Sequence, residues 1–182
     1  MGTVTTLPRG QAFTRDDLDS MPDDGHRYEL IDGTLVVTPA PSPRHQIVLA
    51  ELYDVLRRAC PADLLVLFGP LDVALDDNSV LQPDLLVARR SAFTERDLPA
   101  APLLAVEVLS PSTRRIDLTL KHSRYEAARC PSYWAVDPAA PSLRAWELRN
   151  EEYVEVAHVE GAETFHAHAP YDVAITPAEL LG

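Results

Sequence analysis

The spacing of apolar residues along the chain predicts short strands separated by turns, together with a few helices. Apolar positions in residues 43–59 recur at helical spacing, and we expect that helix to bury Ile47, Leu49, Leu52, Val55, Leu56 and Ala59. A second helix is expected over roughly 113–129, and short ones after Thr14 and from Thr176. The apolar runs that favour strands are 28–31, 34–37, 64–68, 71–75, 84–88, 103–109, 132–136, 143–148, 152–159 and 171–175. Asp32-Gly33 between the first two predicts a tight hairpin turn.

Without its ends, the predicted order is α-β-β-β-α-β. The run 103–109, the helix after it and the run 132–136 form a crossover, which should be right-handed and make its two strands parallel. We therefore expect an α/β (α+β) fold with a mixed central sheet flanked by helices, an extra N-terminal hairpin and extra C-terminal strands. Residues 1–12 show no pattern and are expected to be a flexible tail, and 13–182 a single domain.

Composition narrows the class of protein. There is no stretch of 18 apolar residues and no signal-like start, so we expect a cytoplasmic chain without a membrane span. Two cysteines are too few for a disulfide framework or a cysteine zinc site. The net charge of -12 opposes tight nucleic-acid binding, because phosphates are usually held by Lys and Arg. The main basic cluster is Arg114, Arg115, Lys121, His122, Arg124 and Arg129, which could equally be a solvated helix face.

Two carboxylates carry the candidate chemistry. Glu107 interrupts an apolar strand, where a lone carboxylate is expensive to bury unless it is paired, protonated or bound to a metal. Asp84 begins another apolar strand, and an antiparallel pairing of the two would bring both side chains to one sheet edge. Ionised carboxylates about 4 Å apart repel by about 4 kcal/mol at an effective dielectric near 20, which Mg²⁺ or Mn²⁺ would relieve. Alternatively, Glu107 pairs with an arginine or caps the next helix, and Asp84 is an ordinary aspartate at the end of a loop.

An ordered set of motifs resembles the Uma-two family, a large bacterial group described as restriction endonucleases with the PD-(D/E)XK core. The set consists of Tyr28-Glu29-Leu30-Ile31-Asp32-Gly33, His45, Gln82-Pro83-Asp84, Glu107-Val108-Leu109-Ser110-Pro111-Ser112-Thr113, Asp117, Lys121, Tyr125 and Tyr133-Trp134-Ala135-Val136-Asp137-Pro138. The resemblance covers about residues 14–181. It implies the restriction-endonuclease-like fold, metal ligation by Asp84 and Glu107, and Glu29 as a further acidic member of the site.

The sequence departs from the core signature at one position. Leu109 stands where the fold's lysine is expected, and in this family its role passes to the following helix, here to Lys121. Asp117, Lys121 and Tyr125 can share one helix face, although an ordinary Asp–Lys surface pair has the same spacing. His45 could contact a phosphate or be a structural histidine.

The hypothesis is a Mg²⁺-dependent endonuclease acting on DNA. Asp84, Glu107 and the Val108 carbonyl would hold the ion, Lys121 would orient water or offset developing charge, and Glu29 could bind a second ion or a proton. A homodimer is expected, because cleavage of both strands needs two sites. The alternatives are a catalytically inactive binding or assembly module and an enzyme that hydrolyses smaller phosphodiesters.

Overall fold

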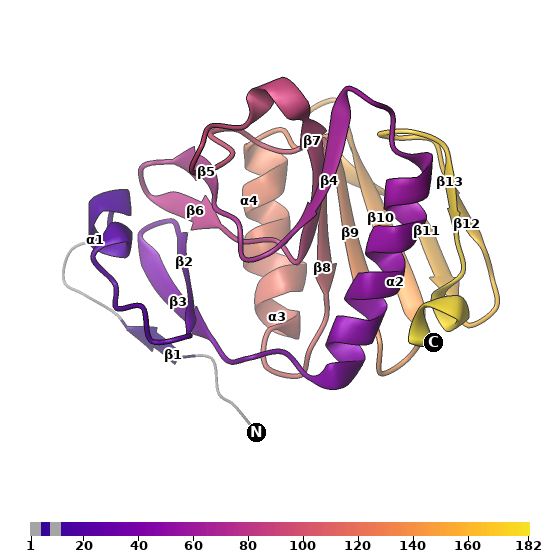
Figure 1. The fold of residues 1–182 in the computed structure, drawn as a ribbon, viewed down its shortest axis with the longest axis horizontal. Coiled ribbons are helices and arrows are strands. Elements are labelled where there is room, and N and C mark those ends of the chain that lie inside the picture. Colours follow the sequence, from indigo (N-terminus) through magenta and orange to yellow (C-terminus); the bar gives the residue numbers. More distant parts are fainter. Residues whose placement is uncertain (1–4, 8–11) are drawn as a thin grey trace.

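The computed structural model describes residues 5–7 and 12–182, and the side chains from residue 12 onward. Its larger sheet has the order β11 (Glu152–Glu160), β10 (Ser142–Arg149), β9 (Ser132–Asp137), β8 (Leu104–Val108), β7 (Leu85–Arg89) and β4 (Leu64–Phe68). Strands β8 and β9 are parallel, as the crossover predicts, and the other neighbours pair antiparallel. The predicted α-β-β-β-α-β order is therefore confirmed, with the helices on both faces of this sheet (Figure 1).

A second sheet lies beside the first, toward the N-terminal end of the chain (Figure 1). Its order is β1 (Thr5–Leu7), β3 (Thr34–Thr38), β2 (Arg27–Ile31), β6 (Ser79–Leu81) and β5 (Val73–Asp76). Asp32 and Gly33 join β2 to β3 with φ of 48° and 75°, so the predicted hairpin turn is confirmed. Residues 5–7 pair with β3 where the sequence shows no pattern. Residues 1–4 and 8–11 of the expected tail lie outside the described residues.

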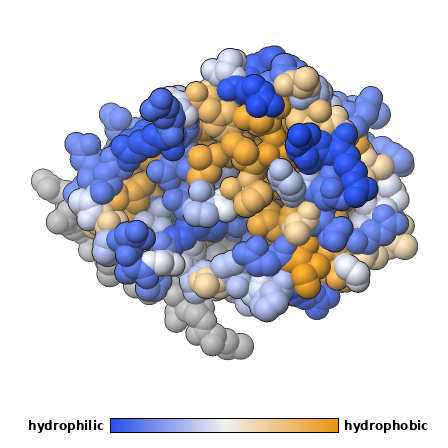
Figure 2. Space-filling view, viewed as in Figure 1, coloured by the Kyte–Doolittle hydropathy of each residue, from blue (hydrophilic) through white to orange (hydrophobic). Residues whose placement is uncertain are grey.

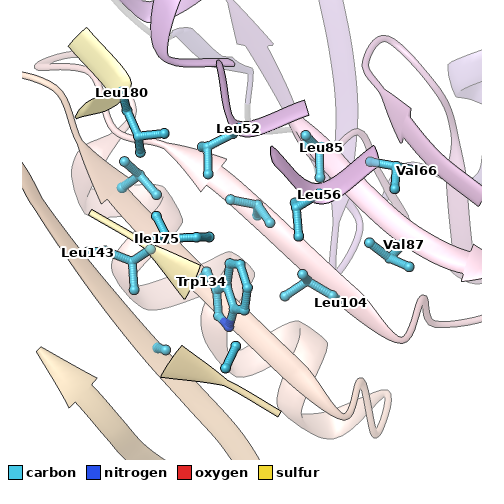
Figure 3. Close-up of a cluster of buried hydrophobic side chains, with 14 of the residues drawn as sticks. Leu52, Leu56, Val66, Leu85, Val87, Leu104, Trp134, Leu143, Ile175 and Leu180 are labelled. Carbon is cyan, nitrogen blue, oxygen red and sulfur yellow. The ribbon is translucent and has the colours of Figure 1, made fainter. Parts of the chain in front are cut away.

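The helix α2 (Pro43–Ala59) covers one face of the larger sheet. Ser42 caps it by accepting a hydrogen bond from the backbone N–H of His45 at 3.2 Å. Below it lies the main apolar core, which also takes in β12 (Phe165–Ala167), β13 (Val173–Ile175) and the 3₁₀ turn Pro177–Leu181 (Figure 3). The predicted buried face is wrong at Ile47, which is 44% exposed, and at Ala59, which is also exposed.

The opposite face is covered by α3 (Arg114–Ile116), a π-helical turn (Asp117–Lys121) and α4 (His122–Ala127). Thr113 precedes α3 at the N-cap position. Two short helices complete the described chain: α1 (Arg15–Asp19), capped by Thr14 as predicted, and the 3₁₀ turn Arg90–Ala92. None of the helices in residues 12–182 is long and apolar enough to cross a membrane.

Candidate functional site

The strand pairing brings the two predicted carboxylates to the same end of the sheet. Leu85 of β7 is paired with Val106 of β8, so one residue further along Asp84 and Glu107 stand opposite each other. The backbone N–H of Val108 donates a hydrogen bond to Asp84 Oδ2 at 2.8 Å, which fixes the aspartate beside the end of β8. Both side chains are buried, Asp84 to 5% exposure and Glu107 to 0%. The predicted convergence at one edge is therefore what the fold produces.

Lys121 reaches the same place from the covering helix. Its Nζ lies 2.7 Å from Glu29 Oε1 and 3.1 Å from Glu107 Oε1, with Asp117 Oδ1 at 3.8 Å. The side chain is 1% exposed, which excludes the surface-pair interpretation of Asp117 and Lys121. The sequence also shows that Lys121 is the only lysine among the 182 residues. We call Glu29, Glu107, Asp117 and Lys121 the closed cluster.

The π-helical turn places this lysine. A π turn inserts an extra residue into a helix and recurs at functional sites, and here it spans Asp117–Lys121. Tyr133 of β9 donates its hydroxyl to the Asp117 backbone carbonyl at 2.8 Å, and the same carbonyl accepts a hydrogen bond from the His122 backbone N–H, so the turn is tied to β9. Both ends of the turn are buried, so the Asp117, Lys121 and Tyr125 face predicted from spacing points inward.

Asp84 belongs to a second group, formed with Arg27 and His45. Arg27 Nη1 donates to Asp84 Oδ1 at 2.8 Å, and Arg27 Nη2 lies 3.5 Å from Glu29 Oε2. His45 Nε2 lies 3.0 Å from Asp84 Oδ2, so this histidine contacts the candidate site directly. We call Arg27, His45 and Asp84 the open cluster, because all three line the cleft described below.

The charges of the two clusters are unbalanced. Four carboxylates (Glu29, Asp84, Glu107 and Asp117) share two permanent cations, Arg27 and Lys121. Burial raises the pKa of Glu107 well above its usual range, against the pull of Lys121. Burial likewise raises the pKa of Asp117 to about 6. Burial also opposes ionisation of Asp84, but the His45 hydrogen bond and the Arg27 charge outweigh it and hold the Asp84 pKa below its usual range.

A cleft of about 810 Å³ opens onto the open cluster. Its walls come from the end of α1, from β2 and β3, from the start of α2 and from the loop 110–113. Glu29, Glu107 and Lys121 are absent from its lining, so the cleft reaches Asp84 but not the lysine. Figure 2 shows apolar side chains gathered over the middle of this face, between the N-terminal sheet and α2, with hydrophilic side chains around them.

The side chains of the site are of a type that can bind a divalent cation. Glu29 Oε2 and Glu107 Oε2 are buried without a hydrogen-bond partner in the described part of the chain, and carboxylate oxygens are what Mg²⁺ prefers. Both oxygens of Asp84 are engaged, however, by Arg27, His45 and the Val108 N–H. Accordingly, no group of three or more His, Cys, Asp or Glu side chains within residues 12–182 is already placed to hold a metal ion. The chemistry fits, provided that a cation replaces Arg27.

Comparison with known proteins identifies the family. A family model described as "Putative restriction endonuclease" matches residues 15–177, which is most of the chain. The chain belongs to the Uma-two family. A solved structure described as a putative nuclease of DUF820 from Anabaena variabilis matches this Uma-two chain with a TM-score of 0.76 and 17% identity, covering 93% of this chain and 99% of that chain. A search of curated proteins finds no match.

At that identity, the solved structure shows the fold of this Uma-two chain and not its reaction. The predicted mixed α+β, nuclease-like fold is confirmed. The roles assigned to Asp84, Glu107, Lys121 and Glu29 remain predictions, although the fold brings all four together. Val108 contacts Asp84 through its backbone N–H, and metal ligation by the Val108 carbonyl also remains a prediction.

The predicted basic cluster is not a free cationic surface. Three of its four arginines pair with carboxylates: Arg114 with Asp137, Arg124 with Asp76, and Arg129 with Glu151, while Arg115 is exposed. Lys121 is buried in the closed cluster, and His122 packs edge-on against Tyr133, Trp146 and Tyr153. This helix of the Uma-two chain therefore offers little uncompensated charge to a phosphate backbone.

Arg27 is the site residue that sequence reasoning missed. It directly precedes the Tyr28-Glu29 motif at the first position of β2, and an arginine there looks like an ordinary strand-end residue. One signal was present in the sequence. Arg27 stands two residues before Glu29, and residues two positions apart in a strand lie on the same face.

Proposed function

We propose that this Uma-two chain is a metal-dependent endonuclease that hydrolyses phosphodiester bonds in DNA. The observation that carries the proposal is the buried group of four carboxylates that share two cations, of which Asp84 lines a cleft. Asp84 and Glu107, with the Val108 carbonyl, would hold Mg²⁺ or Mn²⁺. Such an ion, when bound, supplies a water of lowered pKa and polarises the phosphodiester.

The side chains of the site would have the other roles in the reaction. Lys121 contacts Glu29 and Glu107 rather than the cleft, so we assign it to holding these two side chains in place. His45 fixes the orientation of the Asp84 carboxylate, whose second oxygen it contacts at 3.0 Å. Glu29 would accept a proton or share the ion. The cleft admits the phosphate to the Asp84 side of the group.

The test is cleavage of circular DNA, because a circle has no ends for an exonuclease. Supercoiled plasmid and a single-stranded circle are incubated with purified protein at low salt, with Mg²⁺, with Mn²⁺ or with chelator. We expect metal-dependent nicking, and at least a 100-fold loss in D84N and in E107Q. Asp97 provides the matched control, because it is equally buried at 5% and pairs with Arg15 away from the cleft.

The outcomes separate catalysis from folding. The D97N variant should keep its activity, and circular dichroism should show that all variants are folded. Full cleavage by D84N, or an equal loss in D97N, would refute the site. Circles that stay intact with both metals, or activity that survives chelation, would refute a metal-dependent endonuclease.

A second candidate function is a catalytically inactive module that keeps the nuclease fold. The observation in its favour is that Arg27 and Lys121 already pair with the carboxylates, so the site can be satisfied without a metal ion. This reading expects no cleavage of either circle and no heat of Mn²⁺ binding in calorimetry. Metal-dependent nicking that disappears in D84N excludes it.

A further inference from the structure

Arg27 occupies the position that a cation would take between two of the candidate ligands. One arm of its guanidinium donates to Asp84 Oδ1 at 2.8 Å, and the other lies 3.5 Å from Glu29 Oε2. Its Nε donates to Thr38 Oγ1 at 3.0 Å, which sets the plane of the fork. An arginine fork matches carboxylate geometry and forms strong charge-assisted hydrogen bonds. Arg27 and a metal ion therefore compete for the same oxygens.

Arg27 also differs from Lys121 in its access to the cleft. Its side chain is 23% exposed and lines the cleft, whereas Lys121 is 1% exposed and does not. A guanidinium at the cleft wall can leave the carboxylates without opening the core. The buried ammonium cannot. Of the two internal cations, Arg27 is thus the one that can be exchanged.

The charges of the cleft lining indicate what the released guanidinium would bind. Among the residues that the structure describes there, Arg27 is the only arginine or lysine, and the lining carries the acids Asp19, Asp23 and Asp72 besides Asp84. A phosphodiester entering the cleft finds no other permanent positive charge among the described residues of its walls. Phosphate is the bidentate partner that a freed arginine fork prefers.

We propose that Arg27 is a positioning residue that closes the carboxylate site before metal and substrate bind, and that turns to the substrate phosphate when a divalent cation takes its place. The proposal rests on the proposed function for its substrate, a nucleic-acid phosphate, and on the Arg27 contacts for the exchange itself. It predicts opposite changes in one variant: removing Arg27 should strengthen metal binding and weaken substrate binding.

The metal arm uses Mn²⁺ alone, without nucleic acid. Calorimetric titration should give R27Q at least a 10-fold lower dissociation constant for Mn²⁺ than the unmodified chain, and the thermal midpoint of R27Q should rise more on adding Mn²⁺. R27K keeps the charge but loses the fork, so its gain should be smaller. The matched control is R89Q, which makes the same charge change at an exposed pair with Asp63 at the far end of β7. Its Mn²⁺ affinity should not change.

A double variant locates the gained affinity. R27Q combined with D84N should lose the tighter Mn²⁺ binding, because Asp84 is the carboxylate that Arg27 releases. If R27Q does not stay folded without metal, R27K carries the same test with its smaller gain. The substrate arm is the KM for the single-stranded circle, which should rise at least 5-fold in R27Q while R89Q keeps the original value.

The outcomes judge the inference and the function separately. Tighter Mn²⁺ binding in R27Q supports the exchange, even if the unmodified chain cleaves nothing, and that combination removes the nuclease function alone. Equal or weaker Mn²⁺ binding in R27Q and R27K overturns the exchange, including the case in which no variant binds Mn²⁺. Cleavage by the unmodified chain together with that result leaves the nuclease function standing.

Discussion

The two clusters hold the same kinds of groups in different surroundings. The closed cluster has carboxylates and an ammonium at 0 to 2% side-chain exposure, behind the sheet and the π-helical turn. The open cluster has a carboxylate and a guanidinium at 6% and 23%, at the floor of the cleft. Burial removes water from the first and leaves some to the second. The first therefore acts as a fixed support and the second as the part that a ligand can rearrange.

The largest effect should come from removing the closed cation. K121M leaves Glu29 and Glu107 buried without their ammonium, and breaking a buried pair typically costs about 3–5 kcal/mol of unfolding free energy. R27M should cost less, about 1.5–3 kcal/mol, because Asp84 loses one charge-assisted hydrogen bond but keeps its contacts with His45 and the Val108 N–H. Urea unfolding at pH 7 measures both.

The exposed pair of Arg129 and Glu151, at 70% exposure each, supplies the baseline. R129Q should change the unfolding free energy by less than about 0.5 kcal/mol. A cost for R27M equal to that for K121M would break the comparison between the clusters, since it would make the two cations equally indispensable to the fold.

How much of this contrast the sequence could predict depends on the residue. Asp84 and Glu107 stand out because a carboxylate next to or inside an apolar run has few ways to be satisfied. Lys121 was assigned through the resemblance to the Uma-two family, because its helical spacing with Asp117 also fits an ordinary surface pair. Arg27 could not be found this way, because the direction of a strand-end side chain depends on which strand pairs beside it.

The fold shows the same limit. The αβββαβ order and the hairpin follow from local pattern and turn chemistry. The placement of β5 and β6 in the N-terminal sheet does not, because pairing between distant strands leaves no local signature. The exposure of Ile47 was missed because helical spacing gives a face but not how far that face is covered.

A second prediction uses the pH dependence of the closed cluster. Burial raises the pKa of Asp117 to about 6, above its ordinary value of 3.8. The folded state then binds this proton more tightly than the unfolded chain, so the unfolding free energy falls as pH rises from about 4 to about 6. D117N should reduce this fall in the unfolding free energy by roughly 2–3 kcal/mol.

Denaturant titrations at pH 4, 5 and 6 measure this slope. Glu107 contributes a fall of the same sign, so some slope should remain in D117N. Asp97 is the control: hydrogen bonds from Arg15 and Thr94 lower its pKa, so its contribution has the opposite sign and D97N should not reduce the fall. An unaltered slope in D117N would mean that Asp117 is ionised in the folded protein and that Lys121 satisfies it fully.

The smallest predicted effect is a difference in unfolding free energy between phenylalanine variants of two buried tyrosines beside the closed cluster. Tyr133 donates its hydroxyl to the Asp117 carbonyl at 2.8 Å, whereas the Tyr125 hydroxyl is buried without a hydrogen-bond partner among the described residues. Y133F should cost about 1 kcal/mol, because it removes a buried hydrogen bond to the Asp117 carbonyl, which then keeps the bond from the His122 N–H. Y125F should be neutral or slightly stabilising, because it removes a polar group that burial already penalises.

Thermal and urea unfolding of the two variants, which each lose a tyrosine hydroxyl, measure the difference directly. A cost above about 1 kcal/mol for Y125F would show that its hydroxyl has a polar partner in solution, and the orphaned Glu107 Oε2 in the same cluster would be the first group to examine.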